Sequence, residues 1–224
     1  MKVLIFDSST IINLTMNGLL DLLKELKNIF PGKFIITRSV KYETIDRPLN
    51  NIQYELGALK VSALLDEKIL ELPESLGINP EVLSEKTKEI LNKSNHIFVS
   101  DNEYIHIIDD GEASCLALSL ILNEKGIESA IAIDERTTRM LGEKPDNLHK
   151  LFERKFHSSI IMKKENMPPI QKIRFIRSSE LAYVGWKKGL VKLKNGKVLD
   201  ALLYATKFKG SAISKEEIEE IKKL

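Results

Sequence analysis

Four short runs of apolar and β-branched residues, separated by longer helical patterns, constrain the fold of this 224-residue chain more than any other feature. The runs cover residues 2–6, 33–37, 96–100 and 129–133, with the sequences KVLIF, KFIIT, HIFVS and SAIAI. Each has the length of a strand buried on both faces, as in a parallel sheet. Strands that alternate with helices predict an α/β fold with a central, mainly parallel sheet flanked by helices.

Helical patterns occupy the intervals between these runs, at residues 10–30, 39–60, 79–94 and 111–126. Pro80 suits the first turn of the third pattern, and Gly126 suits the C-cap of the fourth. Residues 156–178 hold two apolar runs separated by ENMPP, which fit a hairpin or a long excursion. Three short helices are then expected within residues 178–190, 198–210 and 214–224. The last begins with a capping box formed by Ser214 and Glu217.

We therefore divide the chain into a core and an extension. Residues 1–141 form the core, and residues 142–224 form a basic C-terminal extension that packs on it. The extension consists of an insertion at 142–180 and closing helices at 180–224. The halves also differ in charge, with a balance of −9 over residues 1–135 and +11 over residues 136–224. A basic second part fits a polyanion ligand, although the lysines could equally serve to solvate helix faces.

Composition excludes several classes of protein. Hydrophobic residues at 43% and charged residues at 29% describe a soluble globular chain, and no apolar stretch is long enough to span a membrane. The N-terminus meets an acid after four apolar residues, too soon for a signal peptide, so a cytoplasmic location is expected. The single cysteine, Cys115, excludes an intramolecular disulfide and is expected to pack in the core. Frequent Lys, Glu and Ile are compatible with a thermophilic source.

Acidic residues recur where predicted strands end or core helices begin. Asp7 follows the first strand and Asp134 follows the fourth, while Glu43 lies early in the helix after the second strand. Glu112 opens the apolar helix at 111–126. The carboxyl ends of parallel strands share one edge of a sheet, so these side chains can meet there. Arg47, one helical turn beyond Glu43, could hold its carboxylate in place.

Each acid alone reads most simply as a turn or cap residue, because acids favour helix N-termini. Four converging acids repel one another unless a cation neutralises them. Only carboxylates, carbonyls and water supply ligands here, and these oxygens suit Mg²⁺ or Mn²⁺. A pair of such ions can activate water and stabilise the leaving oxygen of a phosphodiester.

Four segments in order, VLIFDSSTIINL, VKYET, DDGEASCLALSL and AIDERTTRML, resemble the successive motifs of the PIN-domain family. The resemblance covers residues 1–141, and the tail GKVLDALLYATKFKGSAIS is similar to the closing helices of some prokaryotic members. It implies a PIN-like three-layer fold with a C-terminal extension. Its members are metal-dependent nucleases, many of them VapC-type toxins of toxin–antitoxin pairs, and others act in RNA processing.

Matched position by position, the resemblance assigns roles to particular residues. The catalytic and metal-binding acids are Asp7, Glu43, Glu112 and Asp134. The accessory residues are Ser9 or Thr10 after the first acid, Asp109 and Asp110 before the third, and Glu135 and Arg139 after the fourth. Asp109 and Asp110 leave the identity of the third acid open, because the family often has Asp there. The residues expected to contact the RNA backbone are Arg136, Arg139, Lys163, Lys164, Lys187 and Lys188.

The resemblance thus implies a metal-dependent endoribonuclease that uses Mg²⁺ or Mn²⁺, with RNA as substrate, a possible antitoxin partner and a homodimeric assembly. A catalytically silent PIN-type module that binds RNA, in RNA processing or on the ribosome, is the alternative. Tyr183 and Trp186 could stack on bases, but their helical spacing is more typical of a core. A haloacid-dehalogenase phosphatase needs a second Asp after Asp7, and a receiver domain needs an acid pair in its first loop. Neither is present, and no histidine has the sequence context of a Ser-His-Asp hydrolase.

Overall fold

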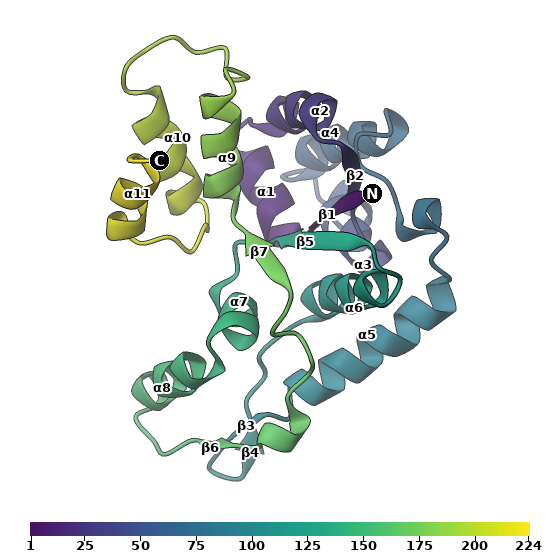
Figure 1. The fold of residues 1–224 in the computed structure, drawn as a ribbon, viewed down its shortest axis with the longest axis vertical. Helices are drawn as coiled ribbons and strands as arrows, with labels where there is room; N and C mark the ends of the chain where they lie inside the picture. Colours follow the sequence, from purple (N-terminus) through teal and green to yellow (C-terminus); the bar gives the residue numbers. More distant parts are fainter.

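The structure, a computed structural model, describes all 224 residues and has an α/β architecture (Figure 1). Its main sheet contains four parallel strands in the order β2-β1-β5-β7. These strands are β1 (Lys2–Phe6), β2 (Gly32–Ile35), β5 (Glu128–Ala132) and β7 (Arg174–Ile176). The first three overlap the apolar runs at 2–6, 33–37 and 129–133, so the predicted α/β class with a parallel sheet is confirmed.

Helices cover both faces of this sheet. Helices α1 (Ser8–Met16), α2 (Leu20–Ile29) and α9 (Ser178–Lys187) lie on one side, and α5 (Pro80–Ser94) and α6 (Asp110–Glu124) lie on the other (Figure 1). The predicted helix over residues 10–30 is divided into α1 and α2 because Gly18 adopts φ +66°, a left-handed conformation that suits glycine. Residues 38–66 form α3 (Arg38–Lys41), the π-helical turn η1 (Tyr42–Asp46), the 3₁₀ turn η2 (Pro48–Asn50) and α4 (Glu55–Asp66).

The run at residues 96–100 is a strand, but it lies outside the parallel sheet. It forms β3 (Phe98–Ser100), which pairs antiparallel with β4 (Glu103–Tyr104) and β6 (Ile161–Met162). Helix α8 (Pro145–Phe156) packs on this small sheet, with the rings of Phe98 and Phe152 5.2 Å apart. Hydrophobic pattern predicts a strand but does not name its partner. The expectation that all four runs share one sheet was therefore wrong for this run.

The fourth strand of the main sheet, β7, comes from the segment that the sequence assigned to an insertion. The two apolar runs of residues 156–178 do not form a hairpin, because β6 pairs with β3 whereas β7 pairs with β5. The central sheet therefore extends beyond residue 141. Between β6 and β7 the chain forms the 3₁₀ turn η4 (Lys164–Asn166), and another 3₁₀ turn, η3 (Pro73–Leu76), precedes α5.

The C-terminal residues form the expected short helices, α9, α10 (Val198–Phe208) and α11 (Lys215–Ile221). The Ser214 hydroxyl accepts from the Glu217 amide at 3.1 Å, and Glu217 Oε2 accepts from the Ser214 amide at 2.8 Å, which confirms the capping box. Tyr183 is buried among apolar residues of α10 and α11, as its helical spacing indicated. Trp186 is 40% exposed.

The main core lies between β1, β5 and the helices on either face. Ile5, Phe6 and Leu116 are fully buried, and Cys115 is also buried, as predicted. Helix α7 (Arg136–Glu143) follows β5 directly and leads to α8. None of the helices combines the length and the apolar character that a membrane crossing requires.

Candidate functional site

Asp7 leaves β1 at the carboxyl edge of the sheet and caps helix α1. Its amide donates to Ala132 O at 2.9 Å, which ties it to the neighbouring strand β5. Its Oδ2 accepts from the Ser9 amide at 3.0 Å and from the Ser9 hydroxyl at 2.5 Å, while its buried Oδ1 has no hydrogen-bond partner. Burial, with a smaller contribution from the charge of Glu43, raises the pKa of Asp7 to about 6.

Glu43 reaches this edge from η1, just beyond β2. A Cβ atom at Gly111 would lie 2.8 Å from both carboxylate oxygens of Glu43, so the absence of a side chain at Gly111 lets α6 approach that carboxylate. Arg47 forms no ion pair with Glu43, contrary to the expectation that it would hold the carboxylate in place. Its side chain is exposed at the C-cap of η1, a π-helical turn in which residues four apart are not aligned as they are in an α-helix.

Glu112, at the start of α6, has two roles. Its Oε2 accepts from the Asp109 amide at 2.5 Å, which caps the helix. Burial and then the charge of Asp7 raise the pKa of Glu112 to about 8, with smaller contributions from Glu135 and Asp109. An acid with this pKa is mostly protonated at neutral pH. Glu112 therefore caps helix α6 and also interacts electrostatically with Asp7, Glu135 and Asp109.

Glu135 is the fourth acid of this group, which we call the carboxylate cluster: Asp7, Glu43, Glu112 and Glu135. It is the N-cap of α7, where its Oε2 accepts from the Thr138 amide at 2.7 Å. Its negative charge acts on Glu112. The resemblance assigned Glu135 only an accessory role.

Asp134 is equally buried, but its carboxylate faces another element. Its Oδ1 accepts at 2.9 Å from the amide of Ser178, the first residue of α9, and its Oδ2 has no hydrogen-bond partner. Burial raises the pKa of Asp134, while the bonds from Ser178 and the charge of Arg139 lower it in part. Successive side chains of an extended segment point to opposite sides, so Asp134 and Glu135 diverge. The Asp134 carboxylate therefore faces α9 and does not join Asp7, Glu43 and Glu112, contrary to the expectation from the sequence.

Ser9 connects the two sides of the site. Its hydroxyl donates to Asp7 and accepts from the Asp134 amide at 3.0 Å. Thr10, the other hydroxyl suggested by the sequence, is fully buried, and its Oγ1 has no partner. Of the two candidates, Ser9 is therefore the one that orients the first acid.

We expect Ser9→Ala to lower the free energy of unfolding by about 1–3 kcal/mol, because the buried Asp134 amide would lose its acceptor. Urea denaturation followed by circular dichroism measures this. Ser84→Ala, at an exposed position on α5, is the matched control and should stay within about 0.5 kcal/mol of wild type. Equal stability of the two variants would contradict the bridging role of Ser9.

The two aspartates before Glu112 lie outside the cluster. Asp109 is exposed and pairs with His106 at 2.7 Å, and Asp110 accepts from the Ser39 hydroxyl. Glu112, which is half-buried, therefore belongs to the carboxylate cluster, and the exposed Asp109 and Asp110 do not. A capping box at the sequence level does not distinguish these positions, since all three acids suit a helix N-terminus.

The basic residues expected to contact RNA do not form one surface. Lys163 donates to the Tyr104 hydroxyl at 2.8 Å near the small sheet, and Lys164 follows it in η4. Lys187 and Lys188 lie at the end of α9, toward the opposite end of the long axis (Figure 1). Lys187 donates to the Leu224 carbonyl at 2.7 Å. Arg136 and Arg139 are different, because α7 places them directly after the carboxylate cluster.

The carboxylate cluster has the chemistry of a hard-cation site. All its donors are carboxylate oxygens, one of them a buried oxygen without a partner. Burial and, to a smaller extent, neighbouring negative charge raise the pKa values of Asp7 and Glu112. No group of three or more His, Cys, Asp or Glu side chains is arranged to hold a metal ion. Because Ser9 fixes Asp7, cation binding would require Glu43 and Glu112 to turn toward it.

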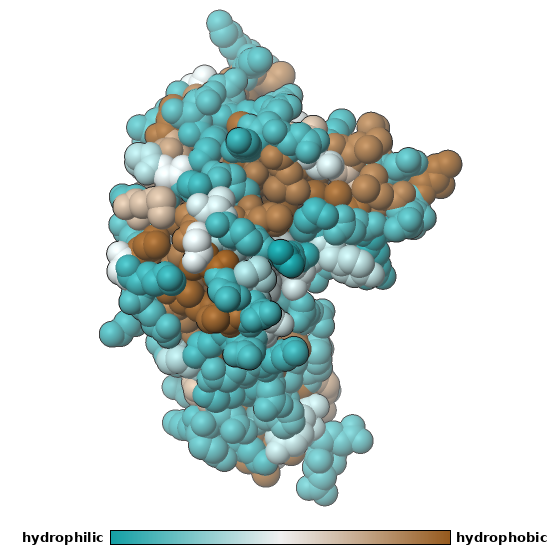
Figure 2. All heavy atoms as spheres, turned by 90° about the vertical axis from the view of Figure 1, so that its right-hand side faces the viewer, coloured by the Kyte–Doolittle hydropathy of each residue, from teal (hydrophilic) through white to brown (hydrophobic).

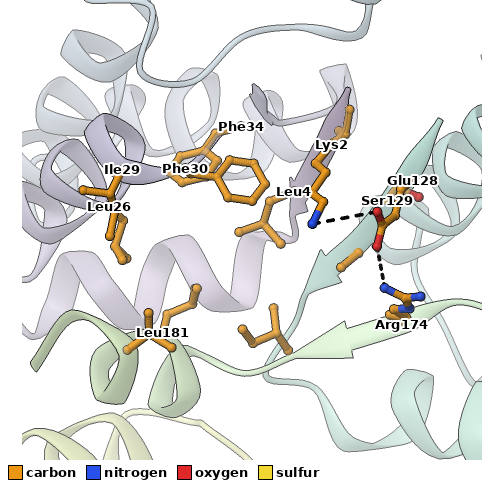
Figure 3. Close-up of a pocket in the computed structure, with 14 residues that line it drawn as sticks. Lys2, Leu4, Leu26, Ile29, Phe30, Phe34, Glu128, Ser129, Arg174 and Leu181 are labelled. Atoms are coloured by element: carbon orange, nitrogen blue, oxygen red, sulfur yellow. Dashed lines mark hydrogen bonds and ion pairs between the residues drawn. The ribbon is translucent and has the colours of Figure 1, made fainter. Parts of the chain in front are cut away.

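An apolar hollow lies at the amino ends of the strands, opposite the edge that holds the carboxylate cluster (Figure 3). It has a volume of about 310 Å³ and is bounded by the sheet, α2 and α9. At its mouth, Glu128 pairs with Arg174 at 2.6 Å and with Lys2 at 4.0 Å. These three residues begin β5, β7 and β1, so the hollow is separate from the carboxylate cluster at the strands' carboxyl ends.

Comparison with known proteins adds no assignment. A scan against protein-family models and searches of curated proteins and of solved structures found no match to this chain.

Proposed function

We propose that this protein is a metal-dependent endoribonuclease with a PIN-like arrangement of its acidic residues. One observation carries the proposal: Asp7, Glu43, Glu112 and Glu135 gather at the carboxyl edge of a parallel sheet, where ligands of open α/β folds bind. A structural role alone does not account for Asp7 and Glu112, whose burial and, to a smaller extent, neighbouring negative charge oppose ionisation. Mg²⁺ or Mn²⁺ would neutralise that charge.

The chain's own groups would act as follows. Asp7, fixed by Ser9, is the anchoring ligand, and Glu43 and Glu112 complete the first set of oxygens. Glu135, held by the Thr138 amide, supports the site beside Glu112. The bound cation would supply a water of lowered pKa for attack on the phosphodiester.

The test is cleavage of a labelled single-stranded RNA by the wild-type protein with EDTA, with Mg²⁺ and with Mn²⁺. Cleavage that requires a metal and is lost in Glu112→Gln supports the nuclease. Cleavage that persists in EDTA, or in Glu112→Gln, would argue against the carboxylate cluster as the catalytic site.

Gly111→Ala is the sharper variant, because it adds one carbon and removes no acid. The new Cβ would meet the Glu43 carboxylate, the mobile end of a flexible side chain, so the fold should persist while Glu43 is displaced. Alanine also favours the helix by up to about 1 kcal/mol relative to glycine. We expect unchanged or higher thermal stability together with a loss of cleavage on the order of 10- to 100-fold, as for disturbed ligand positioning. Wild-type cleavage by this variant would remove Glu43 from the site.

A catalytically silent RNA-binding module is the second candidate. The observation in its favour is the hydrogen bond between Glu112 Oε2 and the Asp109 amide, which commits one oxygen of the third acid to helix capping. This module would bind RNA without cutting it at any metal concentration, and its thermal stability would not respond to Mn²⁺.

We also propose a homodimer, through apolar side chains on and before α4. Ile52, Leu56 and Leu59 are 91%, 66% and 51% exposed, and Figure 2 shows apolar atoms gathered over part of the face that it views. Surfaces of this kind mark interaction sites. Sedimentation equilibrium measures the assembly, and a monomer at micromolar concentration would count against it. A partner protein such as an antitoxin could cover the same side chains.

A further inference from the structure

A polar groove runs along helix α7, and it begins where the carboxylate cluster ends. We call it the α7 groove. It has a volume of about 530 Å³ and is bounded by α7, the start of α8, the end of α10 and the loop before α11. Its charged lining residues are Arg136, Arg139, Lys144, Lys207, Glu143 and Glu217. Glu135 of the carboxylate cluster directly precedes Arg136.

The four cations of the groove lack carboxylate partners. None of them takes part in an ion pair, although the structure contains ion pairs along much of the surface. Lys207 donates to the Ile213 carbonyl at 2.7 Å, and the side chains of Arg136 and Lys144 are exposed. Of the two acids, Glu217 is paired with Arg177 at 2.8 Å. The groove therefore carries an excess of uncompensated positive charge.

Arg139 indicates what kind of ligand this charge suits. Its guanidinium is partly buried and donates only to the Ala212 carbonyl, at 3.3 Å, which Arg177 also contacts at 3.2 Å. Burial and the charge of Arg177 lower the pKa of Arg139, and the charges of Glu143, Glu180 and Glu217 offset this only in part. A partly buried cation without an anion is costly, and the planar guanidinium fork matches the paired oxygens of a phosphate.

The volume and the lining of the groove indicate which phosphate-containing ligand it fits. Its volume is that of a small-molecule site, so it admits a few nucleotides of a single strand and not a duplex. Methionine and isoleucine are its only large apolar lining residues, and no aromatic side chain is available for base stacking. Contacts would therefore reach the sugar–phosphate backbone and not the bases.

From these observations we infer that the α7 groove binds the phosphodiester backbone of single-stranded RNA, adjacent to the bond that the carboxylate cluster cuts. This inference rests on the proposed nuclease function. It adds Lys144 and Lys207 as contacts that the charge pattern of the sequence did not distinguish. The eight residues of α7 span about 12 Å, so Arg136 at its start and Lys144 just past its end would contact different phosphates of one strand.

The test measures binding without cleavage. Fluorescence anisotropy of a labelled RNA oligonucleotide, in EDTA and over a series of salt concentrations, compares the wild-type protein with Arg136→Gln/Lys144→Gln. The side chains of Arg136 and Lys144 make no hydrogen bond or ion pair, so the fold should not change. The control, Lys150→Gln/Arg154→Gln, removes the same charge from exposed residues of α8 that do not line the groove.

Loss of two phosphate contacts should reduce the salt slope of log K by about 1.4 and weaken binding by about 10- to 30-fold at 0.1 M salt. The control should bind as the wild type does. The inference is overturned by wild-type binding in the groove variant, by an equal loss in the control, or by poly-glutamate competing as well as RNA does. Any of these leaves the nuclease proposal to its own test, because metal-dependent cleavage and its loss in Glu112→Gln are measured separately.

Discussion

Replacing Asp7 with Asn should make the metal-free protein more stable and, at the same time, abolish metal-dependent cleavage. At pH 8 the folded protein must hold the Asp7 carboxylate ionised although its pKa is about 6 rather than 3.8. At 1.36 kcal/mol per unit, this opposes folding by about 3 kcal/mol. Asn keeps the shape and caps a helix as well as Asp does, so it removes this cost without removing the cap.

The expected gain is about 1–3 kcal/mol at pH 8, or a rise in melting temperature of several degrees for a chain of this size. Differential scanning fluorimetry in EDTA measures the melting temperature. At pH 4.5 the folded wild-type carboxyl is largely protonated while the unfolded one is still mostly ionised, so the gain should fall to about 1 kcal/mol, and the two melting curves should converge only below pH 3.8. Asp21→Asn, at an exposed position in α2, should show no such gain.

Cleavage by Asp7→Asn should fall by more than the roughly 100-fold that loss of an outer-shell metal partner typically costs. A variant that is less stable than the wild type at pH 8, or that still cuts RNA, would contradict the proposed role of Asp7. Opposite effects on stability and activity are expected where function needs an ionised acid that burial in the folded protein disfavours.

Mn²⁺ should stabilise the wild-type protein strongly at pH 8.5 and little at pH 5. The folded-state pKa values of Asp7 and Glu112, about 6 and about 8, lie above the ordinary values of 3.8 and 4.5. Between pH 4 and pH 8 the folded state therefore binds more protons than the unfolded state, and stability falls as pH rises. Protons at low pH and a divalent cation at high pH would neutralise the same carboxylates, those of Asp7 and Glu112.

Melting temperatures at pH 5 and pH 8.5, in EDTA and in 1 mM MnCl₂ at constant ionic strength, measure this. The gain in free energy of unfolding at pH 8.5 should follow RT ln(1 + [Mn²⁺]/Kd), which is about 2.7 kcal/mol at a hundredfold excess of Mn²⁺ over Kd, and the melting temperature should rise accordingly. In Asp7→Asn the shift should be much smaller. Equal shifts at the two pH values would mean that the cation binds elsewhere.

The sequence predicted those parts of the fold that depend on local pattern. Strand β1 and helices α5 and α6 follow from apolar runs and periodicity, and the position of Asp7 after β1 places it at the carboxyl edge of the sheet. Pairing could not be predicted in the same way. Strand β7 has only three residues, and no local signal indicates that it completes the main sheet while β3 does not.

Long-range packing, which local pattern does not reveal, also explains why Glu135 and not Asp134 joins the carboxylate cluster. Position after a strand gives both residues the correct edge, but which carboxylate turns toward Glu112 depends on Ser178, which approaches only when α9 is packed. Glu112 could be anticipated because its helix is local. The pairing of Glu43 with Gly111 depends on the approach of α6 to η1, which joins residues far apart in the chain.

The late return of the chain to the sheet has a consequence for the order of events during synthesis. All four carboxylates have left the ribosome once residue 135 has emerged, yet β5 keeps an unpaired edge until β7 arrives some forty residues later. Until α9 forms, the Asp134 carboxylate also lacks the Ser178 amide. An open strand edge invites pairing with other chains. The nascent chain thus passes through an interval in which its acids are present but the scaffold that orients them is not, and the last third of the polypeptide ends that interval.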